Sequence, residues 1–217
     1  MKKNARASWI QGVAVVGLIA SSAAAQTVVY DNSVNPLNSY FANQTEFGDQ
    51  INIDGGGWIA HTFSFEYFAS GLGGGETAKF RLYANNGVPT GEFGVQAPGE
   101  LLYESASFPV INGNFPITIT DLAQLNIALP NSMTWTIKTT GVTGGEEFGL
   151  KLYDPPAVGS SFNDIWRFTA DGWELTQIPG FEANFGARLV AVPEPGAGLL
   201  LALGGIALFL RRRAAGR

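Results

Sequence analysis

The chain has 217 residues and a formal net charge of −5, and its composition is 46% hydrophobic but only 14% charged, with no cysteine and one histidine. The lack of cysteine excludes disulfide frameworks, thiolate metal sites and cysteine nucleophiles. A single histidine also excludes zinc sites that need several histidines.

The first 25 residues have the three parts of a secretory signal peptide. A positively charged start (residues 2–6) precedes a short apolar core (residues 10–20), and Ala23 and Ala25 frame a small-residue cleavage site. We therefore expect export by the Sec machinery and a mature chain that begins near Gln26.

Residues 26–191 are expected to form one ectodomain. They contain six basic and seventeen acidic residues, a net charge of −11 that the whole-chain value conceals. A segment of this size can build one core without disulfides. With this acidic balance and no Lys/Arg cluster, nucleic-acid binding is not expected.

Alternation of apolar and polar residues dominates the ectodomain, which predicts half-buried β-strands. The clearest runs are Trp58–Phe68, Thr77–Ala84, Met133–Thr139 and Glu147–Tyr153. Weaker candidates bring the total to roughly twelve strands: Thr27–Tyr30, Phe47–Ile53, Leu101–Val110, Phe115–Asp121, Gln124–Leu129, Ile165–Thr169, Trp173–Ile178 and Asn184–Ala191.

Turn residues separate these runs, and no stretch of the ectodomain has a sustained helical spacing of apolar residues. Gly55-Gly56-Gly57, Asn85-Asn86-Gly87 and Asp171-Gly172 supply the positive φ angles that tight turns need. The pattern predicts an all-β fold, an antiparallel β-sandwich of jelly-roll type, with an open barrel as the alternative.

Motifs for catalysis are nearly absent. His61 shares the predicted strand face of Ile59, Phe63 and Phe65, which favours a core histidine. No G-x-S-x-G, H-E-x-x-H or Walker sequence is present. We expect no catalytic residue and no enzyme, although a polysaccharide hydrolase or lyase stays open because a hydrolase needs only two suitably placed carboxylates.

The ectodomain contains candidate residues for two kinds of binding site. Asp31, Asp49 and Asp54 are weak candidates for calcium because Ca²⁺ prefers oxygen ligands, but their spacing matches no EF-hand, and solvated loop residues are favoured. No cofactor or metal is therefore predicted. A possible sugar-binding face, on which aromatic rings stack, would use residues predicted to point outward or to flank a turn: Trp58, Tyr83, Tyr153, Trp166 and Trp173.

The last 26 residues, 192–217, form a separate segment with three consecutive parts. Pro193, Glu194 and Pro195 come first, and the prolines are expected to keep this stretch extended and outside any sheet or helix. An uncharged run from Gly196 to Leu210 follows. It predicts a single hydrophobic helix that enters the membrane through apolar residues such as Leu199, Leu203, Ile206 and Leu210.

An arginine cluster ends the segment, and Arg211, Arg212 and Arg213 should remain on the cytoplasmic side. At about 1.5 Å per residue the apolar run reaches roughly 22 Å, less than the roughly 30 Å of a hydrocarbon core. This shortness favours a transient, processed anchor over a permanent one.

Together, Val-Pro-Glu-Pro, the Gly/Leu/Ala run and the arginine end resemble the PEP-CTERM tail of Gram-negative bacterial surface proteins. The resemblance implies recognition and processing by an exosortase, an integral membrane enzyme. It also implies association with exopolysaccharide or biofilm matrix.

Parts of the ectodomain are similar to β-sandwich ectodomains of unknown function that precede such tails. The similar segments are Phe63–Tyr67, Ala78–Tyr83, Pro98–Tyr103 and Leu152–Pro156. The resemblance supports the fold and supplies no catalytic residue.

The sequence therefore predicts a secreted, non-enzymatic surface or matrix protein. It would pass through an inner-membrane intermediate before it reaches the cell envelope, cell surface or extracellular matrix. A carbohydrate-binding module on the cell surface is the first alternative.

Overall fold

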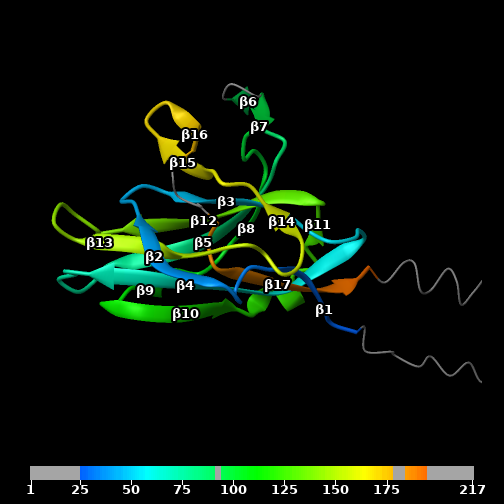
Figure 1. The fold of residues 1–217 in the computed structure, drawn as a ribbon, viewed down its shortest axis with the longest axis horizontal. Helices are drawn as coiled ribbons and strands as arrows, with labels where there is room; N and C mark the ends of the chain where they lie inside the picture. Colours follow the sequence, from blue (N-terminus) through cyan, green and yellow to red (C-terminus); the bar gives the residue numbers. More distant parts are fainter. Residues whose placement is uncertain (1–24, 91–93, 178–183, 195–217) are drawn as a thin grey trace, which may run out of the picture.

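The computed structural model describes residues 25–90, 94–177 and 184–194, and these contain seventeen β-strands and one 3₁₀ turn. The predicted signal peptide up to Ala24 and the predicted hydrophobic helix with its arginine end lie outside the described residues. Figure 1 shows the strands arranged in two layers, with two short hairpins projecting from one of them.

The first layer is a seven-stranded sheet whose central strand is β4 (Trp58–Ser70). Its remaining strands are β1 (Thr27–Asp31), β17 (Ala187–Pro193), β13 (Glu147–Tyr153), β2 (Pro36–Ala42), β10 (Gly113–Ile119) and β11 (Ala128–Leu129). The order β1-β17-β4-β13-β2 places β17 between two partners, while β10 and β11 also pair with β4.

The second layer is an eight-stranded sheet with the order β16-β15-β3-β12-β5-β8. Its strands are β16 (Gly172–Thr176), β15 (Ile165–Thr169), β3 (Phe47–Asn52), β12 (Ser132–Thr140), β5 (Thr77–Ala84), β8 (Leu101–Glu104), β14 (Ser160–Ser161) and β9 (Phe108–Pro109). A separate hairpin is formed by β6 (Pro89–Thr90) and β7 (Val95–Gln96).

All strand pairs are antiparallel, and many successive strands change layer, as β2, β3, β4 and β5 do in turn. This connectivity confirms the predicted all-β, jelly-roll-like sandwich. Aromatic rings from the two inner faces fill the core. Phe63 of β4 lies 4.6 Å from Phe80 and 5.2 Å from Trp135 between ring centroids, and all three side chains are fully buried.

The first half of β4 does not direct all of the predicted side chains into the core, because its pairing with β17 shifts by one residue. Val190 of β17 pairs with Thr62 but Ala191 pairs with Ala60, so one residue of β4 is skipped. Such a bulge changes which side chains point inward. As a result Ala60 joins the core, whereas His61 is only half-buried and accepts a hydrogen bond from the Gln26 amide at 3.0 Å.

The predicted strand Gln124–Leu129 is also corrected, because most of it is a turn. The 3₁₀ turn η1 covers Asp121–Gln124, and the strand β11 begins only at Ala128. Leu122 on this turn is fully buried and belongs to the core. One apolar anchor in a short turn gives no alternating pattern that sequence analysis can detect.

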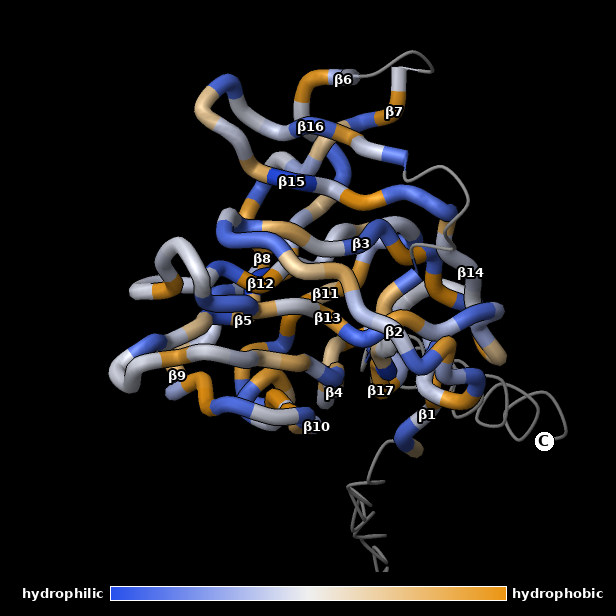
Figure 2. The backbone as a smooth tube through the Cα atoms, turned by 60° about the vertical axis from the view of Figure 1, so that its left-hand side comes forward, coloured by the Kyte–Doolittle hydropathy of each residue, from blue (hydrophilic) through white to orange (hydrophobic). Residues whose placement is uncertain are grey.

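The outer face of the eight-stranded sheet is more covered than the sequence predicts. Thr134 and Thr136, expected on the polar face of β12, are both fully buried. The β15–β16 hairpin extends this sheet beyond β3, and the β6–β7 hairpin lies beside it (Figures 1 and 2). Trp173 of β16 reaches Tyr83 of β5, with 5.4 Å between their ring centroids.

A buried glutamate holds this covered face together. Glu46 accepts hydrogen bonds at 2.8 Å each from Arg81 Nη1, Tyr83 Oη and Thr136 Oγ1. Its side chain is 4% exposed and that of Arg81 is 19% exposed. Both carboxylate oxygens are therefore satisfied, which is the condition for burying a charge without a large loss of stability.

We expect Glu46→Ala to lower the free energy of unfolding by about 3 kcal/mol, because it removes one of the two carboxylate partners of Arg81, the other being Glu104, and the acceptor of two buried hydroxyls. Glu174→Ala is the matched control, since its pair with Arg167 at 3.2 Å lies on the surface and should change stability by less than about 1 kcal/mol. Urea unfolding of both variants measures the difference. Equal losses would show that the buried network adds nothing.

Candidate functional site

The described chain begins and ends at the same end of the sandwich. Thr27 of β1 pairs with Ala191 of β17, and the two strands run antiparallel, so the start of the ectodomain lies beside its last strand (Figure 1). The final contacts are the pairing of Pro193 with Trp58 and a hydrogen bond of 2.9 Å from Glu194 N to Gly57 O.

The expectation that the prolines keep the Pro-Glu-Pro stretch out of the sheet is wrong for Pro193, which is the last residue of β17. Pairing with β1 stops at Ala191, whereas Glu194 still donates to β4. Because successive N–H groups point to opposite sides of a strand, the missing N–H of Pro193 lies on the side without a partner, where a proline is tolerated. Pro195 is outside the described residues.

The residues that lead into this stretch belong to the core. Leu189 and Ala191 are fully buried, while Pro193 and Glu194 are exposed. β17 therefore continues two residues beyond the expected domain boundary at Ala191. The described residues contain no helix that is both long and apolar enough to cross a membrane.

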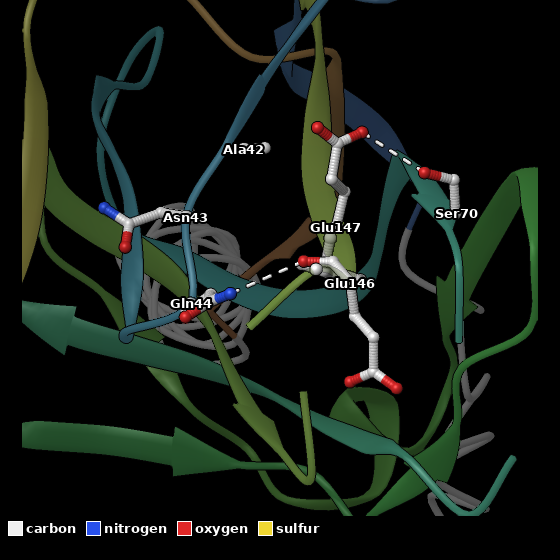
Figure 3. A pocket seen from close by; sticks show the side chains of 8 residues that line it. Ala42, Asn43, Gln44, Ser70, Glu146 and Glu147 are labelled. Carbon is white, nitrogen blue, oxygen red and sulfur yellow. Dashed lines mark hydrogen bonds between the residues drawn. The ribbon is translucent and has the colours of Figure 1, made fainter. Parts of the chain in front are cut away.

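A cavity of about 360 Å³ beside β13 contains two neighbouring carboxylates (Figure 3). Glu147 accepts hydrogen bonds from Tyr40 at 3.1 Å and from Ser70 at 3.2 Å. Glu146 accepts from the backbone N–H of Thr143 at 2.6 Å, and this bond is the main reason that its pKa is lowered.

Figure 3 shows that the two carboxylates of this cavity point in opposite directions. Glycoside hydrolysis needs two carboxyl groups that flank the same bond, so this pair lacks the required arrangement. The bonds of Glu146 to loop backbone groups instead hold the β12–β13 loop in place.

Three of the five aromatic residues considered for a sugar-binding face are buried, which corrects the prediction. Trp166 is 0% exposed, Tyr153 6% and Tyr83 7%. Tyr153 donates to Glu66 and Tyr83 to Glu46, each at 2.8 Å, so their hydroxyls are used inside the fold. Trp58 and Trp173 are half-buried, and the five do not form one exposed row.

Phe162 is not among the residues predicted from the sequence, but its ring is more exposed than any of those five, with 55% of its surface accessible. It lines a cavity of about 300 Å³ together with Gln50, Asn163, Asp164 and Gln177. Phe162 lies in the loop between β14 and β15. A single aromatic residue in a polar loop has no periodicity, so only the fold reveals its neighbours.

The three weak calcium candidates are not gathered into one carboxylate cluster. Asp31 lies 3.3 Å from Arg188 Nε and accepts hydrogen bonds from Ser33, whereas Asp54 is exposed and Asp49 is fully buried. Across the described parts of the chain, no three histidine or acidic side chains are grouped closely enough to hold a metal by themselves.

Asp49 instead belongs to a group of neighbouring polar side chains that we term the polar seam: Asn32, Asp49, Asp154, Asn163 and Asn184, together with Ser161. Asn32, Asp49 and Asn184 are buried, Asp154 and Ser161 are half-buried, and Asn163 is exposed. Ser161 Oγ donates to Asp49 Oδ2 at 2.8 Å. Asn32 Nδ2 donates to the carbonyl oxygens of Tyr153 at 2.9 Å and Phe185 at 3.2 Å. The seam thus joins the start of the chain, β3 and the segment that leads into β17.

Comparison with known families identifies one match, the PEP-CTERM protein-sorting motif, at residues 191–213. No curated protein and no solved structure matches the chain significantly. The motif supports export and sorting to the cell envelope or surface and implies processing by an exosortase-type membrane enzyme. Its first three residues are the last three of β17.

Proposed function

We propose that this chain is a non-enzymatic surface protein whose β-sandwich is presented at the cell envelope after processing of its C-terminal segment. Its route would be Sec-dependent export, an inner-membrane intermediate held by residues 196–210, and processing near Pro193-Glu194-Pro195. We further propose that it associates with exopolysaccharide at the surface, as the resemblance of its tail to PEP-CTERM tails implies.

The observation that carries this proposal is the direct continuation of β17 into the sorting motif. Glu194 N still bonds to Gly57 O, and the apolar run begins at Gly196, only two residues later. Two extended residues span about 7 Å. When the apolar run is in the membrane, this end of the sandwich therefore lies against the membrane surface.

The start of the mature chain supports the same orientation. The signal peptide would end next to Gln26, which precedes β1, and β1 pairs with β17. Before either segment is removed, both would hold the same end of the sandwich at the membrane. No long linker is needed between the folded body and either segment.

Processing is expected to cut the chain on the C-terminal side of Glu194. A cut before Pro193 would remove a residue of β17 and its pairing with Trp58, whereas a later cut leaves every strand contact intact. Intact mass spectrometry of the surface form determines the new C-terminus. A strain without the exosortase should retain Arg217, and so should a variant in which Pro193, Glu194 and Pro195 are alanine.

The matched control for this processing experiment is Glu174→Ala, an exposed substitution on the β15–β16 hairpin, which should be processed normally. If Arg217 is retained in both the wild-type and exosortase-deficient strains, the proposed function is wrong. If the mature protein ends before Pro193, export and processing stand but the position of the cut is wrong.

Carbohydrate binding at the Phe162 cavity is a second candidate function. An exposed ring can stack on the apolar face of a sugar, and amide and carboxylate groups can bond to its hydroxyls. Phe162 is surrounded by Gln50, Asn163, Asp164 and Gln177, which are groups of this kind. The position differs from the aromatic set that the sequence suggested.

Phe162→Ala is expected to weaken binding of the host exopolysaccharide about fivefold, because it removes one stacking surface. Affinity electrophoresis in gels that contain the polysaccharide measures this. Phe168→Ala is the control, since Phe168 is 46% exposed but lies against Trp173 on the hairpin. Identical retardation of the wild-type and Phe162→Ala proteins would rule out this cavity.

A further inference from the structure

Two side-chain oxygen atoms of the polar seam converge on one side-chain nitrogen. Asp154 Oδ1 and Asn163 Oδ1 both accept from a single nitrogen, Nδ2 of Asn184, at 2.5 Å and 2.9 Å. Asn184 is only 2% exposed. A neutral amide group therefore occupies the position between two oxygens where a positive charge would be stabilised more strongly.

Other oxygens of the seam have no hydrogen-bond partner in the protein. They are Oδ1 of Asp49, Oδ1 of Asn184 and Oδ1 of Asn32. Asp49 and Asn184 belong to adjoining parts of the seam, because Asp49 Oδ2 lies 3.5 Å from the backbone nitrogen of Phe185, the residue that follows Asn184. Buried polar atoms are normally satisfied, and an unsatisfied carboxylate oxygen at zero exposure is unusual.

The negative charge of the seam is also uncompensated. Neither carboxylate of the seam, Asp49 or Asp154, forms an ion pair with any described basic residue. Burying an ionised carboxylate such as Asp49 without a positive partner is unfavourable. Either a proton or a cation must reduce this charge.

We propose that the polar seam binds one Ca²⁺ ion through Asp49, Asp154, Asn163 and Asn184. Rotation of the Asn184 amide by 180° would direct Oδ1 to the place of Nδ2, so that three oxygens from Asp154, Asn163 and Asn184 converge. The nitrogen and oxygen of an amide have nearly the same shape, so this rotation needs little space.

The chemistry of these ligands favours calcium over other metals. All four supply hard oxygen atoms, and two of them are carboxylates, so the set does not need a third acidic residue. The ligands come from β3 and from three separate loop segments, which gives an irregular geometry that Ca²⁺ tolerates and Mg²⁺ does not. Two carboxylates are compatible with the modest affinities of extracellular calcium modules.

Such an ion would connect β3 to the segment that leads into β17. Asn184 directly precedes Phe185, which is fully buried and forms a β-bridge with Leu152. The bound ion would thereby stabilise the last strand before the sorting motif. This role does not depend on the proposed surface function.

Thermal unfolding of the full chain in detergent tests the site, first in EDTA and then with CaCl₂ or MgCl₂ at equal ionic strength. At a hundredfold excess over Kd, Ca²⁺ should raise Tm by about 5–10 °C, and Mg²⁺ should have a much smaller effect. Asp154→Asn and Asn184→Ala should abolish this increase. Asp171→Asn, in the exposed turn between β15 and β16, should retain it.

Asp49→Asn keeps the test decisive if the other variants fail to fold. It removes a buried charge while retaining the shape of the side chain, so it should fold in EDTA and lose the response to Ca²⁺. The proposal is overturned if wild-type Tm does not respond to Ca²⁺ in a saturable way, if Mg²⁺ acts equally, or if Asp49→Asn responds as the wild type does.

Discussion

The placement of β17 between β1 and β4 is the constraint on which the rest of the structure depends. This strand closes the seven-stranded sheet beside the start of the chain, contributes Leu189 and Ala191 to the core, and continues without a break into the sorting motif. The sorting segment is therefore attached to an inner strand and not to a flexible tether. Its last residues in the sheet contribute both to folding and to the motif.

The inner faces of the two sheets and the outer face of the eight-stranded sheet bury different kinds of side chain. The inner faces pack mainly aromatic rings, such as Phe63 against Trp135. The outer face of the eight-stranded sheet buries threonines and Glu46, and the carboxylate of Glu46 is satisfied by Arg81, Tyr83 and Thr136. Without cysteines, a fold of this kind depends on packing and on such polar contacts.

The sequence predicts those features of the structure that local residue patterns determine, and fails for those that depend on contacts between distant residues. Thr77–Ala84 matches β5 at both ends because its alternation is local. The β4 bulge, the cover over Thr136 and the burial of Tyr83 depend on partners far away in the chain, so alternation assigns those side chains to the wrong environment. Chemical motifs are local as well, which is why the sorting motif was identified while the Phe162 cavity was not.

The polar seam is another feature that depends on contacts between distant parts of the chain. Its members come from distant segments, and Asp49 lies in a strand whose neighbours Phe47 and Ile51 are fully buried. A purely structural role would favour an apolar residue at this position, since replacing a buried charge by an apolar group is often neutral or stabilising. A carboxylate here makes the stability of the segment before β17 depend on whatever neutralises it. The strand that carries the start of the sorting motif would then be stably packed only when that partner is bound.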